Sequence, residues 1–461
     1  MNFAGESVAI AGAGPTGALL AILLERRGIG VTLYDSRPDP RRGADQSGRS
    51  INLALADRGI HALALAGVLD EIKGALCPMR GRFVHQPDGS GSLQPYGRRA
   101  DEVIYSISRA KLNRTLLEVA LGRPGVQARF EHRLEEADFG ARIARFKDLR
   151  SGAAIEVPMR PLLAADGAGS VTRRRMAAQG LIEVLEADLE HGYKELTVPA
   201  GPGNSYRMER EALHIWPRGG YMLIALPNED GSFTATLFLP ASGPLGFSSL
   251  DTARAVEGFM SENFPDACEL MPDCVAQFQR NPTGSLGTVY ARGWHVRDTA
   301  ALIGDAAHAI VPFHGQGMNC CFEDCVEFDA CLDRSTAWGE IFERFYASRK
   351  PNTDAIAEMA LENYLEMRER VADPTWRLRQ SLALDLERRF PLRFIPRYSM
   401  VMFHHEIPYR TALERGAIQT RLLAELTENA ATLADVDYRR AAREIESRLE
   451  PLSVLSSVTK L

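Results

Sequence analysis

Gly12-Ala13-Gly14-Pro15-Thr16-Gly17 is the stretch of sequence that decides the fold of this chain. An apolar run over residues 7–11 precedes it, residues 18–27 have helical composition, and a second apolar run covers residues 31–34. Glycines at these spacings allow a tight turn and let the backbone approach a pyrophosphate at the N-terminus of the following helix. We therefore predict a strand–helix–strand unit that binds a dinucleotide; the alternative is a tight turn without a ligand.

Asp35 stands where the second strand of such a unit ends, about 18 residues after Gly17. An acidic side chain in this place accepts hydrogen bonds from the ribose hydroxyls of a dinucleotide. Residues 161–165 form a further apolar run, and Asp166-Gly167 follows it before a helix that carries arginine. The short loop that follows this strand is a second feature typical of a nucleotide site.

A second glycine-rich stretch lies far downstream, and it reads Gly304-Asp305-Ala306-Ala307-His308-Ala309-Ile310-Val311-Pro312-Phe313-His314-Gly315-Gln316-Gly317-Met318-Asn319. It follows the apolar residues 300–303, and a helix that begins near Met318 would direct its N–H groups at a ligand. One domain that holds a dinucleotide at two such distant contacts favours flavin adenine dinucleotide, FAD, over a freely exchanging nicotinamide.

The order of these segments predicts an α/β fold with a discontinuous cofactor domain. We expect a Rossmann-like FAD-binding domain over residues 1–76, 100–190 and 289–372. Alternating, aromatic-rich runs indicate an inserted antiparallel-sheet substrate domain over residues 77–99 and 191–288. Residues 373–461 have helical composition, interrupted by prolines, and are expected to form a helical C-terminal region.

Charge and hydropathy narrow the class of partner. The chain has 461 residues, a net charge of -6 and a pI near 6.0, which give no general attraction for nucleic acid or an anionic membrane. No signal peptide and no apolar run long enough to span a bilayer is found, so a cytoplasmic location without a membrane anchor is the expectation. A small-molecule substrate is expected, and no protein partner is indicated.

Four of the seven cysteines, Cys320, Cys321, Cys325 and Cys331, crowd into one predicted helix. They lack the two separated ligand pairs of a structural zinc site, so we expect buried small side chains and no metal. His308, three residues after Asp305, could suggest a hydrolytic pair, but a Gly-x-Ser-x-Gly elbow is missing. A structural role for His308 is the preferred interpretation.

The three cofactor signatures, in this order, resemble the single-component flavin-dependent aromatic hydroxylases, the family related to para-hydroxybenzoate hydroxylase. Within that family the chain is most similar to the kynurenine 3-monooxygenase group. The resemblance rests on the stretch from Gly304 to Asn319 and on further blocks: Gly48-Arg49-Ser50-Ile51-Asn52-Leu53-Ala54-Leu55, Met79-Arg80-Gly81-Arg82, Gln94-Pro95-Tyr96-Gly97, Gly192-Tyr193-Lys194-Glu195-Leu196, Leu213-His214-Ile215-Trp216-Pro217, Ile224-Ala225-Leu226-Pro227-Asn228, Ser232-Phe233-Thr234 and Phe394-Ile395-Pro396-Arg397-Tyr398-Ser399-Met400.

The resemblance implies a tightly bound FAD, NADPH as a transient co-substrate, and molecular oxygen. It implies hydroxylation of L-kynurenine to 3-hydroxy-L-kynurenine through a flavin C4a-hydroperoxide, a step of tryptophan catabolism toward NAD biosynthesis. Animal members carry a C-terminal membrane anchor that is missing here, so a soluble bacterial type is expected. The alternatives are another flavin-dependent aromatic hydroxylase or a flavoprotein redox sensor of the same fold; a Trp-x-Trp-x-Ile-Pro motif, typical of halogenases, is not present.

The resemblance also assigns cofactor-binding residues. Leu134 and Val171 would act through their backbone, Arg109 could instead be a solvated residue at a helix start, and Asp305 could instead cap a helix or turn. The full predicted set is Gly12, Gly14, Thr16, Gly17, Asp35, Arg37, Ala54, Arg109, Leu134, Val171, Asp305, Gly317, Met318 and Asn319.

For the substrate, the carboxylate of an α-amino acid requires a fixed cation, and an arginine matches it with two hydrogen bonds. Arg82, in an otherwise apolar run, is the candidate, and Tyr96 could add a hydroxyl donor. Asn363 and Tyr398 match substrate positions of the family. Glu366 shares a helix face with Asn363 and could pair with Arg82, Tyr96 or the substrate ammonium, or both could lie on a solvated face. No residue is nominated as a catalytic base, and His314 is not expected to be essential.

Overall fold

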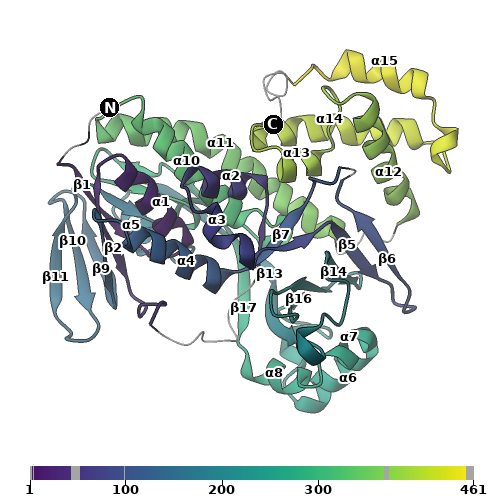
Figure 1. Ribbon diagram of the computed structural model, residues 1–461, viewed down its shortest axis with the longest axis horizontal. Helices are drawn as coiled ribbons and strands as arrows, with labels where there is room; N and C mark the ends of the chain where they lie inside the picture. The colour runs from purple at the N-terminus through teal and green to yellow at the C-terminus, as the bar shows by residue number, and fades with distance from the viewer. Residues whose placement is uncertain (1–2, 4, 43–51, 98, 368–372, 453–461) are drawn as a thin grey trace. The chain divides into compact units, whose positions relative to one another are not determined.

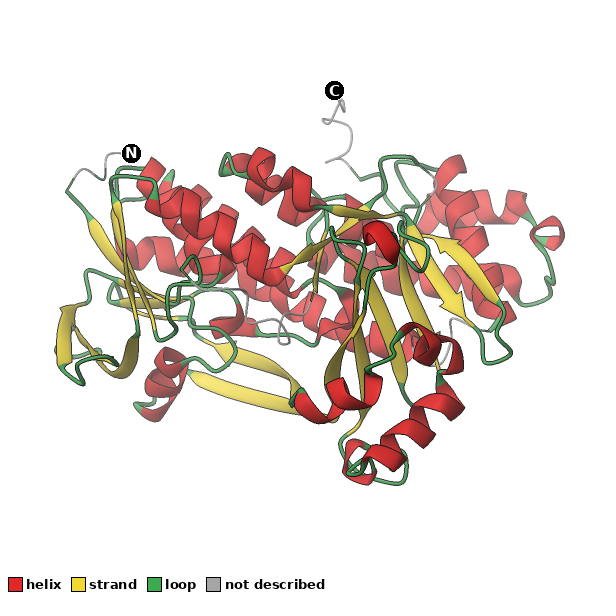
Figure 2. Ribbon diagram, turned by 60° about the horizontal axis from the view of Figure 1, so that its bottom comes forward, coloured by secondary structure: helices red, strands yellow, loops and turns green. Residues whose placement is uncertain are grey.

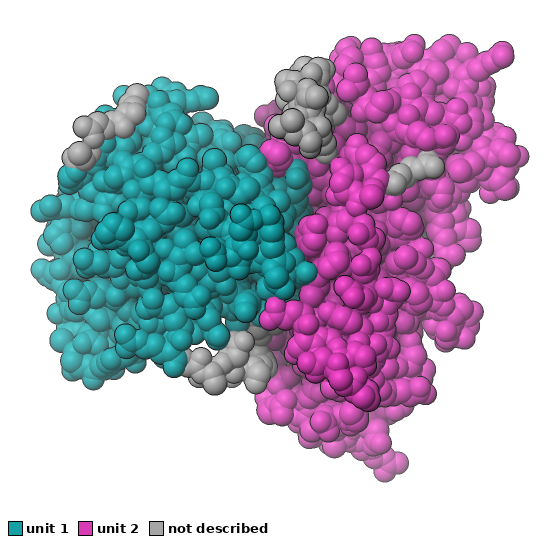
Figure 3. Space-filling model, viewed as in Figure 1, with its two compact units in different colours: residues 1–76, 106–190, 285–357 teal, residues 77–105, 191–284, 358–461 magenta. Residues whose placement is uncertain are grey.

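The chain folds into two compact units, which the computed structural model describes over residues 3, 5–42, 52–97, 99–367 and 373–452 (Figure 3). The first unit comprises residues 1–76, 106–190 and 285–357, and the second comprises residues 77–105, 191–284 and 358–461. The chain passes from one unit to the other within β13, β17 and α11, among other places. The predicted division into a cofactor domain, a substrate domain and a helical C-terminal region remains a proposal, and the contacts within the structure divide the chain into two units.

A six-stranded sheet forms the centre of the first unit, in the order β18-β19-β12-β1-β2-β8 (Figure 1). Its strands pair in parallel except β18, which runs antiparallel to β19. The predicted strand–helix–strand unit is confirmed, since β1 covers the predicted residues and α1 lies between β1 and β2. The bounds are β1 (Ser7–Ala11), α1 (Pro15–Arg26), β2 (Gly30–Asp35), β8 (Val126–Phe130), β12 (Leu162–Ala164), β18 (His295–Val296) and β19 (Ala300–Leu302).

Helices and a small sheet surround these strands. Helix α1 packs against β1 and β2 and against α4 and α10, and α10 also packs on α2. The remaining elements of this part of the chain are β3 (Asn52–Leu55), α2 (Asp57–Leu65), α3 (Leu69–Ile72), β7 (Ile104–Ser108), α4 (Arg109–Leu121), the antiparallel β9 (His132–Asp138), β10 (Ile143–Asp148) and β11 (Ala154–Pro158), α5 (Val171–Ala178), α9 (Asp305–His308), α10 (Gly317–Leu332) and α11 (Trp338–Leu365).

A break separates two helices of the first unit, because α2 ends at Leu65 and α3 begins only at Leu69. Gly67 between them has a φ of 71°, which a continuing α-helix cannot accommodate. The part of the block Gly48–Leu55 before Asn52 lies outside the described residues.

The second unit is built on a seven-stranded sheet in the order β17-β13-β16-β15-β14-β5-β6. The prediction of an antiparallel sheet is corrected at one place, because β5 pairs with β14 in parallel. Since these two strands are far apart in sequence, no hairpin forces them to be antiparallel. The bounds are β5 (Gly81–His85), β6 (Gly91–Pro95), β13 (Glu183–Val198), β14 (Ala212–Pro217), β15 (Met222–Pro227), β16 (Phe233–Pro240) and β17 (Thr283–Arg292). Strand β4 (Cys77–Met79) precedes β5 and is not part of this sheet.

Two helical groups complete the second unit. Helices α6 (Ala253–Asn263), α7 (Pro265–Leu270) and α8 (Cys274–Arg280), which the sequence analysis missed, share one apolar core with β13–β16. The predicted C-terminal helices are present, among the helices drawn red in Figure 2, as α12 (Pro374–Arg389), α13 (Arg397–Phe403), α14 (Tyr409–Thr427) and α15 (Tyr438–Arg448). Helices α12, α14 and α15 share a second apolar core. Across the described ranges, no helix is both long and apolar enough to cross a bilayer.

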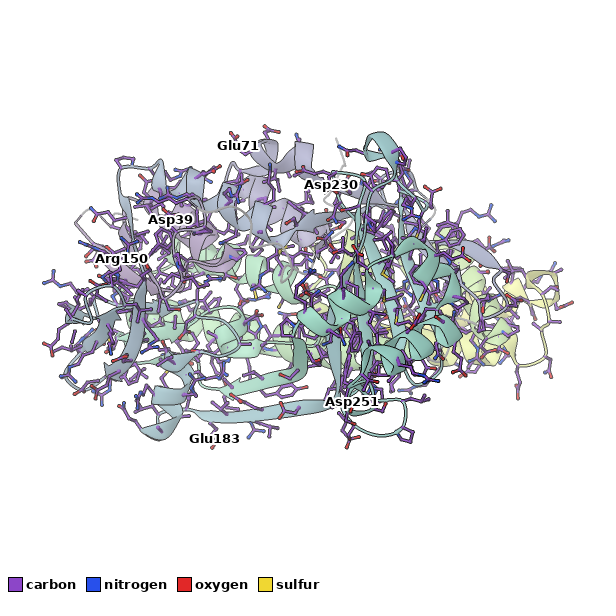
Figure 4. All side chains as sticks on the ribbon, turned by 90° about the horizontal axis from the view of Figure 1, so that it is seen from below. Asp39, Glu71, Arg150, Glu183, Asp230 and Asp251 are labelled. Carbon is purple, nitrogen blue, oxygen red and sulfur yellow. The ribbon has the colours of Figure 1, made fainter. Side chains whose placement is uncertain are left out.

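Charged side chains project from the surface of both units. Glu71 and Arg150 of the first unit and Asp230 and Asp251 of the second are exposed examples (Figure 4).

Candidate flavin and substrate sites

The glycine turn after β1 has no room for a side chain at Gly12 or Gly17. Gly12 has a φ of 103°, and a Cβ there would lie 2.2 Å from the carbonyl oxygen of Ala165. A Cβ on Gly17 would lie 2.0 Å from the carbonyl oxygen of Gly12. No side chain caps the N-terminus of α1, where Gly14 is the N-cap residue. The turn therefore presents free helix N–H groups beside an open backbone, which suits a pyrophosphate.

Asp35 at the end of β2 holds this turn in place. Its carboxylate accepts a hydrogen bond of 2.8 Å from the backbone N–H of Ala13 and three bonds from Arg37, two of them from the guanidinium. Burial alone would raise the pKa of Asp35, but the hydrogen bonds and charge of Arg37 hold the pKa below its usual range. Asp35 is thus a fixed carboxylate next to the turn; its contact with a ribose remains a prediction.

Asp166 lies beside the same glycine turn, although it was not among the predicted binding residues. Its Oδ2 accepts from the backbone N–H groups of Val171 at 2.8 Å and Thr172 at 3.2 Å. Its Oδ1 is buried and accepts no hydrogen bond from the described residues, and burial raises the pKa of this carboxyl group. A buried polar atom without a partner beside the Gly12 turn fits a site that a polar cofactor completes. The Asp-Gly strand end was the signal for it in the sequence.

The downstream stretch forms two tight turns and the start of α10. Gly304 and Gly315 have φ values of 64° and 66°. The Asn319 side chain donates to the carbonyl groups of Ala54 at 2.8 Å and Gly315 at 2.9 Å, and it accepts from Ala56 N–H at 2.9 Å. Two predicted flavin-contact residues, Ala54 and Asn319, are therefore joined. Because the Asn319 amide is engaged within the protein, its contact with a flavin would come from the backbone.

The two glycine-rich stretches meet in the first unit. A Cβ on Gly304 would lie 3.1 Å from Cγ2 of Thr16, and the Cys325 thiol donates to the Thr16 carbonyl at 3.6 Å. Gly317 and Met318, at the start of α10, are half-buried. Arg109 is exposed at the first position of α4, and Leu134 is buried in β9. The roles of Arg109 and Leu134 toward a cofactor remain predictions.

The crowded cysteines lie in α10 and are buried. His308, Cys320 and Asp324 offer three possible metal-ligand atoms within 4.8 Å of one another. The guanidinium of Arg349 donates to Asp324 at 2.7 Å and to Cys320 Sγ at 3.4 Å, and His308 donates to Asp324 at 2.5 Å. Burial raises the pKa of the Cys320 thiol well above its usual value. An arginine thus holds the place of a cation, which argues against a metal at this cluster.

In the second unit, Arg82 of β5 is buried between two tyrosines. Its guanidinium carbon lies 4.9 Å from the ring centroid of Tyr398 in α13 and 5.7 Å from that of Tyr96. The two rings stack at 5.6 Å with an interplanar angle of 21°. Both hydroxyls hydrogen-bond with Arg82. Three predicted substrate residues from distant parts of the sequence therefore form one cluster, called here the Arg82 cluster.

Electrostatics keep the Arg82 cluster in one protonation state. Burial alone would lower the pKa of Arg82, but Tyr398, Tyr96 and Glu366 raise it above its ordinary value. Burial raises the pKa of Tyr96 and of Tyr398, so both hydroxyls stay neutral donors at physiological pH. The cluster is a permanent cation with two neutral hydroxyls.

The two predicted residues near the end of α11 behave differently. Oε1 of Glu366 lies 4.0 Å from Nη1 of Arg82, which is the limit of an ion pair. Asn363 is 5% exposed, and its amide donates to Sδ of Met367 at 3.3 Å. The solvated-face alternative is therefore wrong for Asn363. Because the Arg82–Glu366 pair is loose, the guanidinium can still serve a carboxylate ligand.

Comparison with known proteins shows the family of this chain. A family model described as FAD binding domain matches residues 6–333. A kynurenine 3-monooxygenase of Myxococcus xanthus is 46% identical over 446 residues, 97% of this chain and 96% of the relative. Another, from Stenotrophomonas maltophilia, is 48% identical over 449 residues, 97% of this chain and 98% of the relative.

Solved structures share the fold at low identity. The tetrameric form of 2-methyl-3-hydroxypyridine-5-carboxylic acid oxygenase aligns with a TM-score of 0.65 at 19% identity, over 80% of this chain and 94% of that one. HpxO of Klebsiella pneumoniae, solved with FAD and uric acid, aligns with a TM-score of 0.64 at 19% identity, over 84% and 95%.

The fold and the paired glycine turns define a FAD-dependent flavoprotein monooxygenase. The chain belongs to the kynurenine 3-monooxygenase family.

Proposed function

We propose that this enzyme consumes NADPH and molecular oxygen to hydroxylate L-kynurenine to 3-hydroxy-L-kynurenine. The observation that carries the substrate assignment is the Arg82 cluster, a buried guanidinium flanked by two stacked tyrosines. The names of the relatives, which are 46–48% identical over nearly the whole chain, support the same substrate. An aromatic hydroxylase with another kind of substrate, or a redox sensor, would not require a buried cluster that can bind the carboxylate of an amino acid.

In this proposal Arg82 binds the α-carboxylate of the substrate. A planar guanidinium presents parallel N–H groups that match a carboxylate, and burial strengthens the pairing. Tyr96 and Tyr398 donate further hydrogen bonds because their hydroxyls remain protonated. Glu366, whose side chain is 23% exposed and lies 4.0 Å from Arg82, would pair with the substrate ammonium. Asn363, three residues before Glu366 in the sequence, is buried, and we assign it to orienting the substrate.

The first unit would hold the cofactor. The Gly12 turn and the N-terminus of α1 would bind the pyrophosphate, and Asp35 would accept from the ribose. The start of α10, with Gly317, Met318 and Asn319, has no side-chain cap, so its N–H groups and helix dipole can stabilise negative charge on the reduced ring. When bound, FAD supplies the redox chemistry that activates oxygen.

The protein's own residues then have three tasks in this reaction. They orient the amino acid through Arg82, hold the cofactor through the glycine turns, and exclude water from both. The aniline nitrogen of kynurenine already makes the neighbouring ring position electron-rich. A protein base that deprotonates the substrate is therefore not needed, and we assign none.

The direct test compares NADPH consumption with L-kynurenine, 4-hydroxybenzoate and urate, with each product identified by mass. The proposal predicts fast oxidation and a product with one added oxygen for L-kynurenine alone. Oxygen insertion into one of the other acids in its place would favour another hydroxylase. NADPH oxidation that is indifferent to every aromatic compound would favour a redox sensor.

A further inference from the structure

A buried set of charges in the first unit has no role in the function described so far. Helix α10 carries Glu323 and Asp324, and they face two arginines, Arg58 of α2 and Arg349 of α11. Arg58, Asp324 and Arg349 are 1%, 0% and 2% exposed. We call these four residues and His308 the buried ion network. Burying two carboxylates and two guanidiniums carries a large desolvation penalty, and well-packed apolar side chains often serve stability as well or better.

The contacts of Asp324 differ from those of an ordinary ion pair. Its Oδ1 accepts from Nε of Arg349 at 2.7 Å, while its Oδ2 accepts from Nε2 of His308 at 2.5 Å and from the backbone N–H of Gly304 at 2.9 Å. Burial would raise the pKa of Asp324, but His308 and Arg349 hold it below the usual range. Asp324 is thus an anion whose charge is directed at a backbone turn.

That turn is the one that joins the two glycine-rich stretches. Gly304 has φ 64° and ψ -141°, a conformation open mainly to glycine, and Asp305 follows it directly. A Cβ on Gly304 would approach Thr16 of the first stretch and Sγ of Cys321, each at 3.1 Å. The hydrogen bond from Gly304 to Asp324 therefore fixes a strained backbone position between Thr16 and Asp305, both assigned to FAD.

The other end of the buried ion network reaches the residues that follow Ala54, which is one of the predicted cofactor-binding residues. Arg349 also donates to Glu323 at 2.6 Å, and Glu323 pairs with Arg58. Arg58 lies in the first turn of α2, two residues after Ala56, whose N–H donates to the Asn319 side chain. One chain of ion pairs therefore connects the Gly304 turn, the middle of α10 and the residues that follow Ala54.

We propose that Asp324 and Arg349 are positioning residues for FAD, which hold the Gly304 turn and the segment after Ala54 in the conformation that binds the cofactor. Neither residue needs to touch FAD. The inference rests on the FAD-dependent part of the proposed function and not on the identity of the substrate.

The test is a double variant, Asp324→Leu with Arg349→Met, studied by the dissociation constant for FAD and the melting temperature of the apoprotein. Removing both partners leaves Arg58 paired with Glu323, so no carboxylate or guanidinium of the network is left buried and unpaired, and most of the thermal stability is expected to persist. Gly304 N–H loses its charged acceptor, and FAD is expected to bind about tenfold more weakly or worse.

Asp329→Asn is the matched control. Asp329 lies on the same helix and forms an ion pair of 2.6 Å with Arg27, but it has no contact with the Gly304 turn. FAD affinity of this variant is expected to stay within about twofold of the unaltered protein. Wild-type FAD affinity in the double variant would overturn the proposal. So would equal weakening by Asp329→Asn, because FAD loss would then follow any ion-pair loss on α10.

Arg349→Lys gives a second test if the double variant does not fold. It keeps the charge, but an ammonium does not reproduce the fixed fork that binds Glu323 and Asp324 together. The proposal predicts a folded protein with faster FAD release, and unchanged release would contradict it. FAD binding is measured without any aromatic substrate, so a failure here leaves the kynurenine assignment intact, and a failure of that assignment leaves this inference intact.

Discussion

Arg82→Met tests how the substrate is recognised. Methionine keeps the apolar stem of a side chain that is 7% exposed and removes its charge. Truncating one partner of a buried, hydrogen-bonded charge pair costs about 2–5 kcal/mol, so a loss near 3 kcal/mol corresponds to a dissociation constant for L-kynurenine raised about 150-fold. Glu366 stays partly solvated, so the fold and the FAD content are expected to persist.

The assay is a binding cycle with kynurenamine, the analogue that lacks the carboxylate. The unaltered protein is expected to bind kynurenamine much more weakly than L-kynurenine, while Arg82→Met is expected to bind both alike. Arg80→Met is the control, since Arg80 lies two residues away in sequence and pairs with Glu211 at the surface. The carboxylate assignment is refuted if Arg82→Met weakens both ligands by the same factor, or leaves L-kynurenine binding unchanged.

Three further predictions concern the framework. Gly12→Ala is expected to abolish FAD retention, because its Cβ would lie 2.2 Å from the Ala165 carbonyl oxygen, and a purified variant with stoichiometric flavin absorbance would contradict this. Asn319→Ala removes three hydrogen bonds and is expected to lower the free energy of unfolding by about 3 kcal/mol, measured by urea titration; a change under about 0.5 kcal/mol would oppose it. Burial lowers the pKa of His214 to about 4 in the folded protein, whereas in the unfolded chain this side chain binds a proton near pH 6.5. Stability is therefore full above pH 6.5 and falls by up to about 3 kcal/mol as the pH drops toward 4. His214→Gln should flatten that part of the stability curve, and parallel curves would refute the assignment.

Local chemistry made the cofactor half of the fold predictable. The strand over residues 7–11, the helix after it and the strand that ends at Asp35 follow from apolar runs and glycines that are neighbours in sequence. The same reasoning found the helix that begins at Arg109 and the start of α10.

The missed features depend on contacts between distant segments. The parallel pairing of β5 with β14 joins residues about 130 positions apart, and helices α6–α8 lie close together in sequence, with Pro265 at the start of α7 and Pro272 between α7 and α8. Such pairings are decided by packing, which a propensity pattern does not encode.

The candidate sites show the same difference between features that neighbouring residues predict and features that depend on contacts between distant segments. The sequence alone suggested that Arg82 could bind a carboxylate, and the family resemblance named Tyr398 as a substrate residue, but only the structure shows the Tyr398 ring 4.9 Å from the Arg82 guanidinium carbon. Asp324 was missed because a buried acid and an exposed acid look alike in a helix sequence, and only the structure shows Gly304, His308 and Arg349 converging on it.

The most direct test of the central claim is a single turnover mixture of the enzyme, NADPH and L-kynurenine under oxygen-18 gas, followed by mass spectrometry of the product. The account predicts that NADPH disappears in step with the formation of 3-hydroxy-L-kynurenine that carries one heavy oxygen atom. Heavy hydrogen peroxide with unaltered kynurenine, or a product whose new oxygen comes from water, would contradict it.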